Sequence, residues 1–223
     1  MWPASPEQLI ETQRGLAAAI PEPWRRPAGP LTIGACVVVF ERGLAGRGAR
    51  GDPAWVAAAV LRRRRVVDAA NIKTTAAGPY APGLLALREG PCLEAAVRAL
   101  TLTPDVLLVD ATGADHPRRA GLALHLGAVA GLPTVGVTHR PLLAQGAWPE
   151  DVRGAHSPLI LDGDVVSAWL RTRRGARPVA VHPGWRTTLT DAIEVVSSAA
   201  FGHRTPQALR YARHRARIAR ANG

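Results

Sequence analysis

Two carboxylates in this chain lie where they could meet and do chemistry. Asp110 ends the apolar run 105–110 (DVLLVD), which predicts a short buried strand, and Glu89 lies in 87–91 (LREGP). Open α/β sheets place their sites at the carboxyl ends of strands, which is where Asp110 is expected. Two carboxylates held together could bind a hard divalent cation such as Mg²⁺. Each also has a plain structural explanation, Glu89 as an exposed helix acid and Asp110 as a turn cap.

Other reactive side chains accompany these two in the sequence. The loop 111–119 (ATGADHPRR) follows Asp110 directly and is dense in polar groups, among them His116. Cys36 lies in a strongly apolar run, and its thiol would be nucleophilic only if a nearby cation lowered its pKa. Without such a cation Cys36 is a small buried hydrophobe, and His116 is a histidine that serves its own loop.

The elements expected to hold these residues alternate along the chain. Proline lacks the N–H that helix bonding needs, so Gly90-Pro91 is expected to break or restart a helix. The order is one helix, three strands and then alternating helices and strands, which predicts one mixed α/β sheet flanked by helices. The Arg62–Arg65 run is expected to be a solvated turn, and 41–53 a loop. The expected helices are 6–19, 84–100, 120–130, 188–198 and 206–221, and the expected strands are 31–40, 54–61, 66–72, 105–110, 133–137, a hairpin over 159–170, and 178–181.

The composition describes a folded domain with an unusual charge. The 223 residues are 47% apolar and suit a single domain over 1–223, and two cysteines exclude a disulfide framework. The N-terminus lacks the features of a signal peptide and no apolar run predicts a membrane span, so a cytoplasmic protein is expected. The net charge is +11, and Lys73 is the single lysine among 28 basic residues. Arginine favours phosphate recognition, although a GC-rich genome would also replace lysine by arginine.

Several long motifs of this chain resemble those of the endonuclease V family. Residues 79–91 (PYAPGLLALREGP) are similar to its signature PYxPGxLxxREGP, and 104–127 to its block PDVLLVDGxGxxHPRxxGxAxHxG. Residues 132–137 (LPTVGV), 171–184 and the helix start at 206–210 also resemble family segments. The resemblance runs from about Thr32 to His214, and its long ungapped middle block is far more specific than a short motif.

The resemblance implies a fold, an activity and a set of site residues. The fold would be ribonuclease-H-like, and the activity cleavage of a phosphodiester near deoxyinosine in DNA or inosine in RNA, with Mg²⁺ or Mn²⁺. In that family a first-strand carboxylate, the Glu of REGP and the Asp of LLVD organise the metal, and the tyrosine of PYxP wedges beside the lesion. The corresponding residues here are Cys36, Glu89, Asp110 and Tyr80.

The chain departs from the family pattern at catalytic positions. Cys36 replaces the first-strand aspartate, and a thiol is a poor ligand for Mg²⁺. His139 stands in place of a family lysine, and Trp185 in place of the histidine of SPGH. The final-helix histidine aligns with Arg213, whereas His214 lies one residue later, about 100° further around the helix.

Three functions are compatible with these residues. The first is an endonuclease V-like nuclease, weakened by the loss of the first-strand aspartate, with its metal held by Glu89 and Asp110. The second is a module that binds inosine-containing DNA or RNA without cutting it. The third is an enzyme that uses the same fold on a small-molecule substrate. The candidate catalytic residues are Glu89, Asp110, His116, Cys36, His139 and His214, and the candidate substrate-binding residues are Tyr80, Pro79, Pro82, Arg88, Gly113, Arg118, Arg210 and Arg213.

Overall fold

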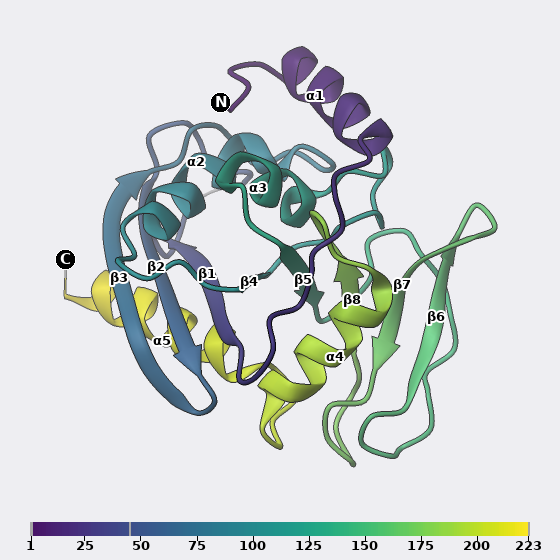
Figure 1. Ribbon diagram of the computed structural model, residues 1–223. Helices are drawn as coiled ribbons and strands as arrows, with labels where there is room; N and C mark the ends of the chain where they lie inside the picture. Colours follow the sequence, from purple (N-terminus) through teal and green to yellow (C-terminus); the bar gives the residue numbers. More distant parts are fainter. Residues whose placement is uncertain (1, 45, 223) are drawn as a thin grey trace.

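An eight-stranded mixed sheet forms the centre of the protein, with helices on both of its faces (Figure 1). The computed structural model describes residues 2–44 and 46–222, so residue 45 of the expected loop 41–53 lies outside the described residues. The strands are β1 (Thr32–Phe40), β2 (Pro53–Arg62), β3 (Arg65–Thr75), β4 (Val106–Val109), β5 (Thr134–Thr138), β6 (His156–Leu161), β7 (Asp164–Leu170) and β8 (Val179–Pro183). The helices are α1 (Pro6–Ala18), α2 (Leu85–Arg98), α3 (Leu122–Ala130), α4 (Leu189–Ala200) and α5 (Gln207–Ala221). The expected mixed α/β sheet is confirmed.

The strand order β3-β2-β1-β4-β5-β8-β7-β6 places three parallel strands at the centre of the sheet. β4 pairs in parallel with β1 on one side and with β5 on the other, whereas every other neighbouring pair is antiparallel. The Arg62–Arg65 run makes the tight turn between β2 and β3, as expected. The parallel centre brings the carboxyl ends of β1, β4 and β5 to one edge, where the site residues collect.

Each face of the sheet carries its own hydrophobic core. On one face, Ala35 and Val37 of β1 pack with the buried sides of α4 and α5. On the other, Cys36 packs with α1, α2 and α3. This alternation follows from the two-residue period of a strand. Because both faces of the central strands are buried, their sequences are continuous apolar runs.

Helix α2 runs through Gly90-Pro91 without a break, so the expected interruption is wrong. Proline removes one helical hydrogen bond, but five side chains of α2 are buried in the core on this face. They are Ala86, Cys92, Leu93, Ala96 and Val97. Gly90 also faces the ring of Trp2, leaving no room for a Cβ at that position. Packing therefore outweighs the local cost of proline and keeps Glu89 inside a continuous helix.

None of the helices in the described part of the chain has the length and apolar character that a membrane span requires.

Candidate functional site

Three elements meet at the carboxyl end of β4. Asp110 follows β4 directly, and its predecessor Val109 lies in register with Cys36 of β1 and Gly136 of β5. His139 follows β5 at the same edge, and Glu89 approaches from α2. Ala86, one turn before Glu89 in α2, lines the same cavity as Asp110, and the charge of Asp110 raises the pKa of Glu89. The structure thus brings together the two carboxylates that the sequence singled out.

The pKa of the Glu89 carboxyl is raised well above its ordinary value. Burial, and then the charge of Asp110, raise the pKa of Glu89 from its ordinary value near 4.5 to about 7, although Arg88 acts in the opposite direction. Near neutral pH a large fraction of Glu89 is therefore uncharged. A carboxyl in this state is a weak cation ligand and a group that can exchange a proton.

Replacing Glu89 by glutamine should flatten the pH dependence of stability between pH 4.5 and 7. The folded protein binds this proton more tightly than the unfolded chain does, so stability is lost as pH rises through that range. Chemical unfolding midpoints measured across this range would test it, with Glu150→Gln, at an exposed position, as the control. A slope that persists unchanged in Glu89→Gln would contradict the assignment.

Asp110 is held by an arginine from the last helix. The Nη2 atom of Arg213 lies 2.6 Å from Oδ2 of Asp110, and the two side chains are 22% and 44% exposed. Such a charge-assisted hydrogen bond is stronger than a neutral one. His214, the next residue along α5, is exposed and forms no ion pair with a carboxylate of the described residues. Arg213, and not His214, is therefore the α5 residue at this site.

Cys36 is closed off from any chemistry at the sheet edge. Its side chain is 1% exposed, and burial together with the charges of Glu89 and Asp110 raises the pKa of its thiol far above the ordinary value. The thiol therefore stays protonated, and a protonated thiol is neither a nucleophile nor a good metal ligand. Such burial does not suit a nucleophile, and Cys36 lies in the hydrophobic core as a small buried side chain.

These residues do not fit a divalent cation as they stand. A magnesium ion prefers oxygen ligands, but the position on β1 carries a buried thiol. Asp110 is paired with the guanidinium of Arg213 at 2.6 Å, so one of the two remaining carboxylates already has a cationic partner. Across residues 2–44 and 46–222 no cluster of three His, Cys, Asp or Glu side chains could hold a metal. The guanidinium of Arg213 already supplies the positive charge beside Asp110.

His116 and Arg118 hold the turn at Gly83 in place. Nδ1 of His116 accepts a hydrogen bond from the backbone N–H of Arg118, so in the neutral ring Nε2 donates to the carbonyl of Gly83. Burial lowers the pKa of His116 to about 4, which keeps the ring neutral. Arg118 and Gln13 also donate to that carbonyl, at 2.6 and 3.1 Å. Gln13 comes from α1 and was not expected at the site.

His139 lies beside the Arg213–Asp110 ion pair, and its ring also contacts Thr205. Its Nε2 atom is 3.0 Å from the hydroxyl of Thr205. Burial and the nearby charge of Arg204 lower the pKa of His139, while Asp110 acts in the opposite direction. The ring is exposed, and it lies close enough to Asp110 for the two groups to interact electrostatically. His139 is thus a histidine of the predicted set that lies at the sheet edge beside Asp110.

A cavity of about 230 Å³, called here the base cavity, opens next to Asp110. Its rim carries Tyr80, which is 44% exposed, and the flanking Pro79 and Pro82 are exposed as well. Its walls are mainly apolar, with His116 and Asp110 among the few ionisable groups. The remaining lining residues are Gln13, Gly83, Leu85, Ala86, Ala111, Thr112, Leu122, Thr138, Arg140, Pro141 and Leu142.

Asp115, which the sequence did not single out, holds the segment that carries Leu142, a residue of the base cavity wall. It is 0% exposed and accepts hydrogen bonds from the backbone N–H groups of Leu142, Leu143 and Ala144, at 2.6 to 2.8 Å. This contact fixes the segment after β5 over the cavity. No local pattern reveals it, because donor and acceptor lie 27 to 29 residues apart.

Two of the predicted substrate-binding residues, Arg88 and Gly113, have structural roles, and a third, Arg210, is exposed on the surface. Arg88 is 5% exposed; it pairs with Asp52 at 2.8 Å and donates to backbone carbonyls, so its guanidinium is occupied by partners within the protein. Gly113 packs against the carbonyl of Pro183, where any Cβ would clash. Arg210 is exposed on α5 and takes no part in the Arg213–Asp110 ion pair.

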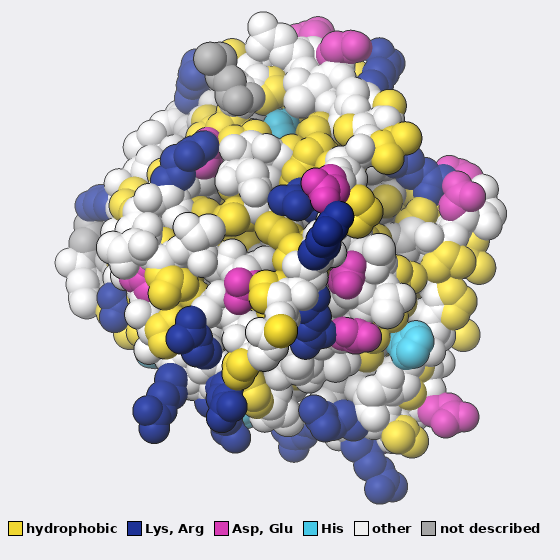
Figure 2. All heavy atoms as spheres, viewed as in Figure 1, with side chains coloured by type: hydrophobic (Ala, Val, Ile, Leu, Met, Phe, Trp, Pro, Cys, Tyr) yellow, Lys and Arg dark blue, Asp and Glu magenta, His cyan; other side chains and the backbone are white. Residues whose placement is uncertain are grey.

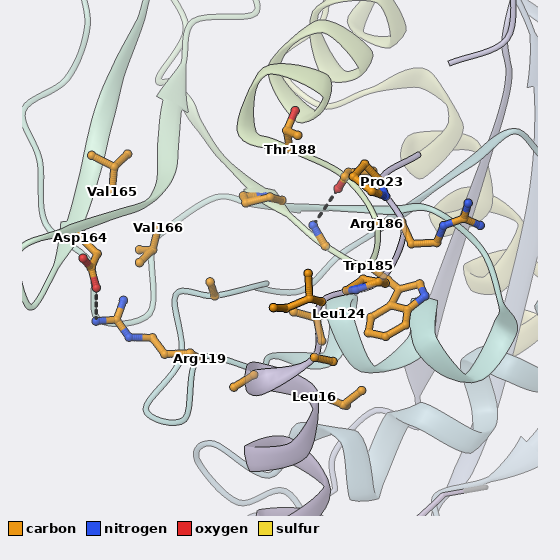
Figure 3. Close-up of a pocket in the computed structure, with 18 residues that line it drawn as sticks. Leu16, Pro23, Arg119, Leu124, Asp164, Val165, Val166, Trp185, Arg186 and Thr188 are labelled. Carbon is orange, nitrogen blue, oxygen red and sulfur yellow. Dashed lines mark hydrogen bonds and ion pairs between the residues drawn. The ribbon is translucent and has the colours of Figure 1, made fainter. Parts of the chain in front are cut away.

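A larger cavity, of about 500 Å³, lies between the end of α1, the start of α4 and β7 (Figure 3). Arg119 reaches across one side of it to Asp164, at 3.4 Å, and Trp185 lies on the other side beside Leu124 of α3. Neither carboxylate of the site lines this cavity. Trp185 is therefore part of the packing around α3 and takes no part in the sheet-edge site.

Comparisons of sequence and of structure with known proteins both identify the endonuclease V family. A model of the family described as endonuclease V matches residues 37–214. Endonuclease V of Methanothrix thermoacetophila is 36% identical over 213 residues, which cover 95% of this chain and 90% of that protein.

Solved structures share the whole fold. Endonuclease V from Streptomyces avermitilis superposes with a TM-score of 0.87 at 34% identity, covering 99% of this chain and 95% of that one. Ciona intestinalis endonuclease V, solved with a 24mer DNA containing an inosine followed by a ribo-adenosine, gives a TM-score of 0.81 at 22% identity, covering 98% and 99%. The expected ribonuclease-H-like fold is thus confirmed, and this chain belongs to the endonuclease V family.

Proposed function

We propose that this protein binds DNA or RNA containing an inosine and holds the extruded base in the base cavity behind Tyr80. The observation that carries the proposal is this cavity beside Asp110, with the exposed ring of Tyr80 at its rim. Its volume of about 230 Å³ is below the range of roughly 300–1,000 Å³ for drug-sized ligands and suits a single base. The Ciona relative was solved with inosine-containing DNA, which supports the same ligand class here.

The start of α2 supplies hydrogen-bond donors to the base cavity. Leu84 caps this helix without a side-chain hydrogen bond, so the first N–H groups of the helix lack helical acceptors. Leu85 and Ala86, the first two residues of α2, line the cavity. Backbone donors at a helix N-terminus suit the carbonyl oxygen of a purine such as hypoxanthine. The apolar walls provide surfaces for the ring itself.

Tyr80 is suited to fill the gap that an extruded base leaves. Pro79 and Pro82 restrict the turn on both sides, and the Tyr80 N–H donates to the carbonyl of Arg47 at 2.8 Å. Gly83 closes the turn at φ +71, a conformation that favours glycine, and His116 helps to hold its carbonyl. An aromatic ring on so rigid a turn can stack on a neighbouring base at little entropic cost.

Strand cleavage is the second candidate function, favoured by Glu89 and Asp110 lying close together with Asp110 in the wall of the base cavity. Members of this family are nucleases, but the Arg213 ion pair and the Cys36 thiol oppose a divalent cation here. We therefore propose recognition as the principal function and cleavage as strongly reduced. A small-molecule enzyme with Cys36 as nucleophile is disfavoured by the burial of that thiol.

Replacing Tyr80 by alanine should weaken binding to a strand with one inosine by about tenfold or more. Stacking of one base on an aromatic ring contributes roughly 1–3 kcal/mol, and about 1.4 kcal/mol is a factor of ten. The measurement is fluorescence-anisotropy titration of inosine strands and of matched guanosine strands, as DNA and as RNA.

Tyr80→Phe is the matched control, because it keeps the ring and should retain most of the affinity. Equal binding of inosine and guanosine strands by the native protein would overturn the proposed function. Equal affinities of native protein and Tyr80→Ala would remove Tyr80 from it.

A further inference from the structure

A third cavity, of about 380 Å³, lies at the far end of α5 and is rich in arginine. It is lined by Arg42 after β1, by Trp55 of β2, and by Arg217 and Arg220 of α5, with Glu41 and Ala221 completing it. Three guanidinium groups face a single acid among the lining side chains. We call it the Trp55 cavity.

The donors of the Trp55 cavity are poorly supplied with acceptors. Arg42 and Arg217 are exposed and form no ion pair with the described part of the chain, while Arg220 donates to the carbonyl of Phe40 at 2.9 Å. Trp55 is 5% exposed, and its buried indole N–H has no hydrogen-bond partner among the described residues. A buried donor left unpaired costs about 1–3 kcal/mol, so native proteins rarely keep one without a reason. Together these groups favour an oxyanion ligand.

Helix α5 connects this cavity to the sheet-edge site. Arg213, which contacts Asp110, is followed by Arg217 one turn later and by Arg220 almost two turns later. At 1.5 Å per residue, Arg220 lies about 10 Å along the helix axis from Arg213. Lys and Arg side chains also gather along the lower edge of the face shown in Figure 2. A strand that passes Asp110 therefore meets further guanidinium groups along α5.

We propose that the Trp55 cavity binds a backbone phosphate of the same nucleic-acid strand whose base lies behind Tyr80. This inference rests on the proposed function, and it adds a second contact point distant from the base. Arginine forks match phosphate oxygens, and the arginine spacing continues from the site along a single helix. Phosphate contacts fix the register of a strand without reading its sequence. The cavity would therefore increase affinity for long strands and leave the preference for inosine unchanged.

The test compares Arg217→Ala and Arg220→Ala with Arg153→Ala, a control with the same charge change at an exposed position between β5 and β6. Two single strands are used: one ends at the nucleotide after the inosine, and the other extends on both sides. Each cavity variant should weaken the long strand several-fold and lower the slope of log affinity against log salt by about 1. The short strand should bind all proteins equally.

Two further arms separate this inference from the proposed function. A long strand without inosine should show the same loss in the cavity variants, even if the native protein proves to have no inosine preference. Trp55→Phe, checked for unchanged thermal unfolding, should weaken the long strand only. Losses no larger than that of Arg153→Ala would overturn the inference. So would binding of inorganic phosphate to the cavity with unchanged long-strand affinity in the variants.

Discussion

The double variant Cys36→Asp with Arg213→Ala is expected to bind Mn²⁺ at least tenfold more tightly than the native protein, which is about 1.4 kcal/mol. Removing the guanidinium frees Asp110, which it now holds at 2.6 Å. The new carboxylate would stand beside Glu89 and Asp110, whose charges already act on Cys36. The site would then offer three carboxylates, at positions 36, 89 and 110, instead of the Cys36 thiol, a partly protonated Glu89 and an Asp110 paired with Arg213. Isothermal titration calorimetry with Mn²⁺ and Mg²⁺ measures the change.

The single variants show why both substitutions are needed. Cys36→Asp alone places a third acid in a buried position beside two others, so it should lower the thermal midpoint, and Mn²⁺ should restore little while Arg213 remains. In the double variant Mn²⁺ should restore the midpoint through its binding to the folded state. Arg210→Ala, on the same helix but without a contact to Asp110, is the control for the loss of charge.

Cleavage provides the second readout of this experiment. The native protein should cut an inosine strand slowly or not at all with Mn²⁺, whereas the double variant should cut it, and a further Asp110→Ala substitution should abolish that gain. Native cleavage as fast as that of the double variant would show that the ion pair is no obstacle. An unchanged Mn²⁺ affinity in the double variant would show that the inherited geometry is lost.

The sheet and its two carboxylates could be predicted from the sequence, because the signals for them are local. Strands β1 and β4 read as apolar runs, and a carboxylate at the end of a parallel strand must lie at the sheet edge. The turn carrying Tyr80 follows from its prolines and from Gly83. The helical pattern of α5 was also sufficient to place Arg213. It lies three and four residues from the buried Ala216 and Leu209, so it borders the buried side of the helix, unlike His214.

The contacts that complete the site could not be predicted, since they join residues far apart in the chain. Gln13 reaches Gly83 across 70 residues, and Arg213 reaches Asp110 across 103. The burial of Arg88 depends on Asp52, which lies in a loop with no regular pattern. The continuity of α2 through Pro91 depends on packing against the sheet, which outweighs the local preference. The sequence shows which residue types occur near the site, but contacts with distant residues decide which of their polar groups remain free to bind a ligand.

Replacing Asp115 by alanine should destabilise the fold by about 3 kcal/mol and open the wall of the base cavity. Three backbone N–H groups would lose a carboxylate acceptor in a buried position, and an unpaired buried donor costs about 1–3 kcal/mol. Part of that cost is relieved if the 142–144 segment moves into water, but then Leu142 leaves the cavity it lines. Inosine binding should therefore fall even at temperatures where the variant is fully folded.

Asp115→Asn separates the charge from the geometry of this contact. One amide oxygen can still accept from Leu143 and Ala144, as Oδ1 does now, but the amide nitrogen would face the N–H of Leu142. Its loss of stability should thus lie between those of native protein and Asp115→Ala. Asp151→Ala, which removes an exposed carboxylate bonded to the N–H of Gly175, should cost no more than about 1 kcal/mol. Urea unfolding and inosine-strand titration of all three variants decide the matter, because an Asp115→Ala protein that binds the inosine strand like the native one would show that Asp115 does not shape the base cavity.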